Sequence, residues 1–206
     1  MTTPNWVNKT IWTGDNLPVM RGMNSHSIDL VYLDPPFNSK ADYAAPLGSK
    51  AVGAAFKDTW SLQDVDLTWI DLIEAKHKVI NHILRSAITQ SNKSYLIYMT
   101  VRLLELKRLL KPTGSLYLHC DPTMSHYLKL LMDAIFGHRN FRNEIVWQRR
   151  YGRAKGSQHQ PKTWGVHNDN ILFYTGGLNT RVAPFRQLSE QEARARFPKV
   201  DNQGRR

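Results

Sequence analysis

The chain alternates between short β-branched or aromatic runs and longer stretches whose apolar residues recur at helical spacing. The run at residues 28–33 is typical of a buried strand, and it stops at Asp34 because Pro35 and Pro36 cannot continue a central strand. By the same criteria, strands are predicted at residues 9–13, 28–33, 115–119, 144–148 and 171–174.

Helices are expected between these strands, at residues 16–23, 65–89 and 95–110, and from Pro122 up to Gly137 with Asp121 as the cap. Residues 38–58 are expected to form a long mobile loop. Strands that alternate with helices predict an α/β layered fold with a mainly parallel sheet. Ligands of such sheets bind beyond the carboxyl ends of the strands, where Asp34 and residues 119–121 lie.

Composition is that of a globular protein, with 41% apolar and 22% charged residues. Lys or Arg interrupts each apolar run before the roughly 20 residues of a membrane span, so no membrane partner is expected. The first eleven residues lack the pattern of a signal peptide, and the single cysteine, Cys120, excludes an internal disulfide. These features predict a cytoplasmic protein.

The net charge of +11 is concentrated in the second part of the chain. Residues 142–206 carry 13 basic and 5 acidic side chains, whereas residues 1–141 carry 15 and 12. Such an excess favours a polyanion such as a nucleic-acid backbone. A solvated basic surface or a disordered end would have the same composition, so charge alone leaves the question open.

Asp34-Pro35-Pro36-Phe37 has the residue types needed to methylate the exocyclic amine of a nucleobase. The amine is a poor nucleophile because its lone pair is delocalised into the ring, and acceptors for its two N–H groups would localise that pair. The prolines would hold the Asp34 carboxylate and the Pro35 carbonyl at one rigid point, and Phe37 could stack on an extruded base. A simple strand exit with an Asp turn is the structural alternative.

Several segments, in order, resemble the N6-adenine and N4-cytosine DNA methyltransferases, in the permuted group whose catalytic motif precedes the methyl-donor motif. They are residues 14–17, 28–38, 55–60, 110–121, 140–147 and 167–174. The resemblance implies a Rossmann-like sheet, S-adenosylmethionine as methyl donor and double-stranded DNA as substrate, in a restriction-modification setting. It favours adenine over cytosine because an Asp opens the motif.

By the same resemblance, Asp34, Pro35, Pro36 and Phe37 form the catalytic site, and Asp15, Asp34 and Pro35 lie near S-adenosylmethionine. A turn-capping role is the alternative for Asp15. His119 and Asp121 would line the rim of the site, with helix capping as the alternative. Cys120 is expected to be structural rather than nucleophilic, and no metal site is expected because the His, Cys and Asp at 119–121 have no second pair at ligand spacing.

The family also has an apolar-x-Gly-x-Gly turn that approaches the cofactor, and this chain contains no Gly-x-Gly. We therefore expect an incomplete sheet, with residues 1–148 as a catalytic half and 149–206 as a basic loop, a further strand and the start of a target-recognition region. A restriction subunit or a C-terminal half is the expected partner. We also expect an unpaired sheet edge beside the 28–33 strand and poor binding of S-adenosylmethionine.

The segment from Arg149 to Lys162 joins cations, glycines and an aromatic residue. Its cations are predicted to contact DNA phosphates: Arg149, Arg150, Arg153, Lys155 and Lys162. A merely solvated loop is the alternative. Two other functions compete for the whole chain, a non-catalytic nucleic-acid-binding remnant or subunit and an enzyme that methylates RNA or protein amines.

Overall fold

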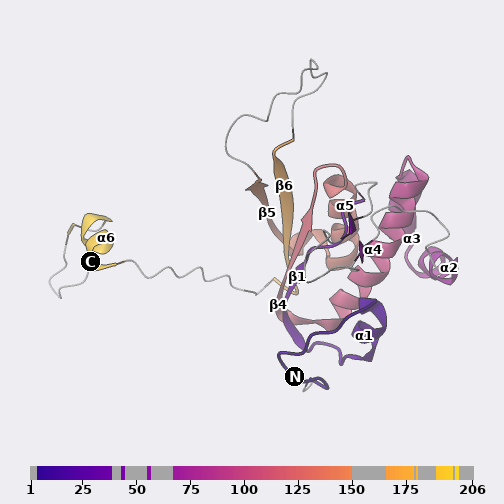
Figure 1. Ribbon diagram of the computed structural model, residues 1–206, viewed down its shortest axis with the longest axis horizontal. Coiled ribbons are helices and arrows are strands. Elements are labelled where there is room, and N and C mark those ends of the chain that lie inside the picture. The colour runs from indigo at the N-terminus through magenta and orange to yellow at the C-terminus, as the bar shows by residue number, and fades with distance from the viewer. Residues whose placement is uncertain are drawn as a thin grey trace, which may run out of the picture.

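The structure is a computed structural model, shown in Figure 1, that describes residues 4–38, 43–44, 55–56, 67–149, 166–178, 180, 189–196 and 198–199. Its centre is a four-stranded sheet in the order β1-β4-β6-β5. These strands are β1 (Ile28–Leu33), β4 (Leu110–Cys120), β5 (Phe141–Gln148) and β6 (Asn168–Thr175). Two short strands, β2 (Tyr43–Ala44) and β3 (Ala55–Phe56), pair antiparallel within the predicted loop.

The prediction of a mainly parallel sheet was wrong for the described strands. β1 and β4 are parallel, but β6 runs antiparallel to both β4 and β5. A helical crossover joins the parallel pair, as parallel strands require. β6, the next described strand after β5, is instead its antiparallel neighbour and lies in the sheet between β5 and β4.

The helices are α1 (Asn16–Gly22), α2 (Leu67–Lys76), α3 (Lys78–Ser86), α4 (Gln90–Leu109), α5 (Ser125–Phe136), η2 (His138–Asn140) and α6 (Glu190–Arg196). The helix predicted at 65–89 is divided into α2 and α3 at His77. α5 ends at Gly137 as predicted, where φ is +90°, a conformation that favours glycine. Among the described residues, no helix is long and apolar enough to cross a membrane.

One face of the sheet packs against helices, which lie to the right of the strands in Figure 1. Leu116 and Leu118 of β4 and Leu172 of β6 join the core on this face, each at most 2% exposed. The core also includes much of α4 and α5. Burying one such side chain stabilises the fold by roughly 1.5–3 kcal/mol relative to leaving it exposed.

The opposite face of the sheet is much less covered within the described part of the chain. Leu30 and Tyr32 are 60% and 57% exposed, although β1 was expected to be buried. The expectation failed because β1 is the edge strand and these residues point away from the helical core. In the middle of this face Tyr117 stacks on Phe173, with ring centroids 4.5 Å apart.

Residues 9–13 do not form the predicted strand. Lys9 has a left-handed φ of +63°, Ile11 is 90% exposed and Trp12 meets the edge of Trp6. A segment that pairs with no strand lacks the backbone hydrogen bonds that would keep it extended. The edge of β1 that faces away from β4 has no strand partner among the described residues.

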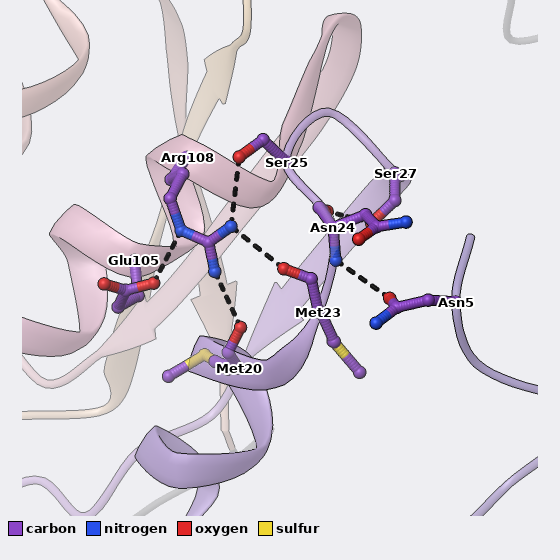
Figure 2. Close-up of polar contacts among 8 residues, drawn as sticks. All are labelled: Asn5, Met20, Met23, Asn24, Ser25, Ser27, Glu105 and Arg108. Carbon is purple, nitrogen blue, oxygen red and sulfur yellow. Dashed lines mark hydrogen bonds and ion pairs between the residues drawn. The ribbon is translucent and has the colours of Figure 1, made fainter. Parts of the chain in front are cut away.

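Arg108, near the end of α4, fixes the turn that leads into β1 (Figure 2). Its guanidinium donates to the carbonyls of Met20 and Met23 at 2.8 and 2.9 Å and to Ser25 Oγ at 3.0 Å. Asn5 accepts from the N–H of Asn24 on the other side of the turn. Arg108 thus gives the Met20 carbonyl a second donor besides the N–H of Met23, and it ties the turn before β1 to α4.

Candidate functional site at the carboxyl end of the sheet

Asp34 comes directly after β1, at the carboxyl end of the strand. Leu33 pairs with Leu118 of the parallel strand β4, so the next residues along the two strands, Asp34 and His119, are neighbours. His119 Nδ1 lies 3.0 Å from Asp34 Oδ1. The Asp34 side chain is 59% exposed, so its carboxylate remains accessible to a ligand.

His119 also faces a second carboxylate, that of Asp169 on β6. His119 pairs with Ile171, so Asp169, two residues away, lies on the same face of the sheet. His119 Nε2 lies 3.4 Å from Asp169 Oδ2, and the Asp169 side chain is only 6% exposed. Arg149, which follows β5, brings its Nε within 3.4 Å of Asp169 Oδ1. The sequence had not indicated Asp169.

Phe37 stands beside the same imidazole. Its ring meets that of His119 edge to face, with centroids 5.0 Å apart and an interplanar angle of 71°. Phe37 is partly buried, as are Pro35 and Pro36. An aromatic side chain therefore lies next to the accessible carboxylate rather than inside the core.

Asn38 anchors the segment that carries Asp34 and Phe37. It is 7% exposed, and its side chain bonds to Asn92 at 3.0 Å and to Ser91 at 2.8 Å at the start of α4. Its φ of +61° lies in the left-handed region, which Asn tolerates better than most residues. An Asn directly after the motif was the available signal, and sequence reasoning gave it no role.

Asp121 and Cys120 have structural roles in the described contacts. Asp121 Oδ1 accepts from the N–H of Met124 at 3.1 Å in the turn before α5. Because α5 begins at Ser125, the prediction that Pro122 is its first residue was wrong by about one turn. Cys120 is buried, as expected, and burial raises the pKa of its thiol to about 12.

Asp15 is occupied by contacts within the fold. It caps α1 by accepting from the N–H of Leu17 at 2.9 Å, and its carboxylate pairs with Arg102 Nη2 at 2.7 Å. Arg102 lies ten residues along α4 from Asn92, which bonds to Asn38 beside the motif. About 15 Å of helix therefore separates the partner of Asp15 from the partner of Asn38. The described contacts thus account for Asp15 as a cap and ion-pair partner.

The expected DNA-binding residues fall mostly outside the part of the chain that the structure describes. Only Arg149 is described, and it is exposed apart from its contacts with Asp169 and the carbonyl of Asn168. Arg150, Arg153, Lys155 and Lys162 lie outside the described residues. Among those described, no group of three His, Cys, Asp or Glu residues is arranged to hold a metal ion.

The exposed Asp34 carboxylate can accept hydrogen bonds from a ligand while the His119 imidazole contacts one of its oxygens. No lysine or arginine is recorded in contact with Asp34 among the described residues. The exposed carboxylate can therefore accept hydrogen bonds from the N–H groups of a ligand, such as an amine, that approaches from solvent.

Comparison with known proteins identifies the family. The sequence model of the N6/N4 DNA methylase family matches residues 28–202, which includes every element from β1 to β6. The chain belongs to this DNA methylase family. Its mixed α/β fold with a four-stranded sheet confirms the predicted class, an incomplete Rossmann-like methyltransferase sheet.

Among curated proteins, the chain resembles the Mod subunit of the type III restriction-modification enzyme StyLTI of Salmonella typhimurium, at 29% identity over 90% of this chain and 28% of that protein. The EcoP15I Mod subunit of Escherichia coli is 27% identical over 79% of this chain and 23% of that protein. The type II methyltransferase M.EcaI of Enterobacter cloacae is 26% identical over 96% and 36%. The chain thus spans about a quarter to a third of the length of these relatives.

A solved structure described as a DNA modification methylase from Thermus thermophilus is also similar. The identity is 16% and the TM-score 0.42, covering 87% of this chain and 57% of that one.

Proposed function

We propose that the chain carries the amine-binding site of an S-adenosylmethionine-dependent DNA methyltransferase in a restriction-modification system. Its acceptor is the exocyclic amine of adenine at N6, in preference to cytosine at N4. The observation that carries the proposal is the Asp34 carboxylate, which is exposed at the carboxyl end of β1 and held by His119 at 3.0 Å. Membership of the DNA methylase family supports the same function.

Each residue of the motif has a task in this proposal. Asp34 and the Pro35 carbonyl accept the two N–H groups of the target amine, which localises its lone pair for attack. Pro35 and Pro36 restrict the backbone that carries both acceptors. Phe37 contributes aromatic surface to a base turned out of the duplex. S-adenosylmethionine, when bound, supplies an electrophilic methyl group on a sulfonium centre.

The described residues fit the amine better than the methyl donor. Asp34 and Pro35 lie at the open strand end, where a donor could approach the amine. Asp15, the third residue expected near the donor, has its carboxylate engaged by Arg102 and by the N–H of Leu17. The chain also lacks the Gly-x-Gly turn expected beside the cofactor. We therefore assign Asp34 and Pro35 to the methyl-transfer site, and Asp15 remains a proposed neighbour of the donor through its exposed carboxylate.

Double-stranded DNA is the proposed substrate, with Arg149, Arg150, Arg153, Lys155 and Lys162 as phosphate contacts. The excess of basic residues in 142–206 supports this assignment. A restriction subunit or a C-terminal half is the proposed partner, since the type III relatives are Mod subunits of restriction-modification enzymes. The proposed location is the cytoplasm, where such DNA is found.

The test is transfer of a labelled methyl group to duplex DNA in a single-turnover format, with protein in excess so that slow transfer is measurable. Asp34→Ala should slow transfer by about 10²–10⁴-fold, the range for a positioned polar group, with DNA binding mostly retained. Asp71→Ala, on the exposed face of α2, is the matched control and should transfer normally. Undiminished transfer by Asp34→Ala would place the active site elsewhere, and label that enters RNA instead of DNA would change the substrate.

A further inference from the structure

We propose that His119 is the positioning residue for Asp34, and that buried Asp169 holds the imidazole in the protonation state this task requires. The inference rests on the proposed function, since it explains how the amine-binding carboxylate is kept in place. It gives a defined task to His119 on β4, which the resemblance had placed at the rim of the site, and it adds Asp169 on β6.

The strand register lines these side chains up across the sheet. Asp34 follows the pair Leu33–Leu118, and His119 pairs with Ile171, which is two residues from Asp169. The contacts run from Asp34 Oδ1 to His119 Nδ1 at 3.0 Å and from His119 Nε2 to Asp169 Oδ2 at 3.4 Å. Both ring nitrogens therefore face a carboxylate oxygen.

Hydrogen-bonding capacity decides what the imidazole must be. A carboxylate oxygen can only accept, so Nδ1 must carry a hydrogen to hold Asp34. Nε2 is buried and makes no hydrogen bond to the residues that the structure describes, and the same is true of Asp169 Oδ1. An imidazole protonated on both nitrogens donates towards both carboxylates, whereas the Nε2–H tautomer would turn a lone pair on Asp34.

Because Asp169 is buried, it is the most restrained of the three side chains Asp34, His119 and Asp169. Its side chain is 6% exposed, against 59% for Asp34. Arg149 Nε, 3.4 Å from the second oxygen, balances part of its charge. β6 is paired on both sides, so the buried Asp169 carboxylate keeps its position when a ligand binds. Asp169 therefore orients His119, and His119 in turn orients the exposed Asp34.

Nuclear magnetic resonance tests the protonation state without any methyl donor. Long-range ¹H–¹⁵N spectra of the ¹⁵N-labelled chain report which ring nitrogens carry a proton, and the His119 signals are those lost in His119→Gln. We expect His119 to carry a proton on both ring nitrogens, and Asp169→Asn to shift its signals. Exposed His126 on α5 is the internal control and should not change. A His119 protonated on one ring nitrogen only, or unaffected by Asp169→Asn, would overturn the proposal.

The variants His119→Asn and His119→Gln then distinguish a positioning role of His119 from a role in stabilising the fold. Asn can place its amide N–H near the position of Nδ1, whereas the longer Gln places its amide towards Nε2. In the single-turnover assay His119→Gln should slow methyl transfer by about 10²-fold, the cost of misplacing a reacting group by roughly 1 Å, with DNA affinity retained. His119→Asn should recover most of the rate.

Equal rates for wild type, His119→Asn and His119→Gln would refute the positioning role while leaving the proposed function intact, provided that Asp34→Ala stays slow. Normal transfer by Asp34→Ala would instead refute the proposed function. Thermal unfolding of each variant shows whether a slow variant is also unfolded. A folded His119→Asn variant as slow as His119→Gln would also count against the proposal.

Discussion

At the scale of single residues, the exposure of a side chain distinguishes residues that can react with a ligand from residues that only support the fold. Asp34 is exposed and Cys120 is buried, although both lie at the carboxyl end of a strand. The sequence favoured a structural role for Cys120 over a nucleophilic one. Its burial removes it from the site, because a thiol reacts as the thiolate and burial disfavours the charged form.

Cys120 should therefore resist alkylation in the folded protein. Its pKa is raised to about 12, first by burial and then by the nearby carboxylates, so the folded thiol stays protonated well above the range of a free thiol. Iodoacetamide labelling followed by mass spectrometry should show slow modification between pH 8 and 10, and rapid modification in urea. Labelling of the folded chain with a midpoint near the pH of a free thiol, about 8.5, would contradict this.

The motif at residues 34–37 could be predicted from the sequence, and the resemblance placed His119 at the rim of the site, but Asp169 could not be predicted. Asp34, Pro35, Pro36 and Phe37 form one motif, and the structure brings Phe37 and His119 beside Asp34. Asp169 lies 135 positions from Asp34, and only the register of β6 against β4 brings it to His119. Register depends on pairing partners, which a pattern within one strand does not specify.

At the scale of elements, the apolar pattern placed most helices and strands but not their partners. β1 covers the predicted residues 28–33, and α5 ends at the predicted glycine. The pattern could not show that β6 runs antiparallel, because burial on both sides produces the same apolar run in either direction. Residues 9–13 were assigned to a strand by composition, yet they pair with no strand of the described sheet.

The Arg108 contacts at the end of α1 predict a measurable contribution to stability. Arg108→Lys keeps the charge but loses the fork that reaches the Met20 and Met23 carbonyls and Ser25. We expect the free energy of unfolding to fall by about 1–3 kcal/mol, the range for lost charged hydrogen bonds. Urea denaturation measures the change.

Arg85→Lys on α3 is the matched control for this measurement. Arg85 is 63% exposed and pairs with Glu74 at 3.2 Å, and an exposed pair of this kind contributes about 0–1 kcal/mol. If the two variants unfold at the same urea concentration, the Arg108 contacts contribute no more than a surface ion pair.

At the scale of the whole molecule, the described part of the chain supplies one side of the proposed reaction. The sheet presents an accessible carboxylate for an amine, whereas Asp15 is held by Arg102 and the Gly-x-Gly turn is absent from the sequence. We therefore predict that the 206-residue chain binds S-adenosylmethionine more weakly than the micromolar range. Isothermal titration calorimetry measures this directly, and micromolar binding by the chain alone would contradict the prediction.

The position of β1 has a consequence for the precision of the site. In the described sheet, backbone hydrogen bonds hold β1 along one side only, while β4 is held along both. Thermal fluctuation of the outer strand therefore displaces Asp34 but leaves the imidazole with its inner strand. The two residues that meet at 3.0 Å thus belong to parts of the sheet with unequal freedom. A binding partner that pairs with the free edge of β1 would therefore restrict the position of the Asp34 carboxylate without contacting it.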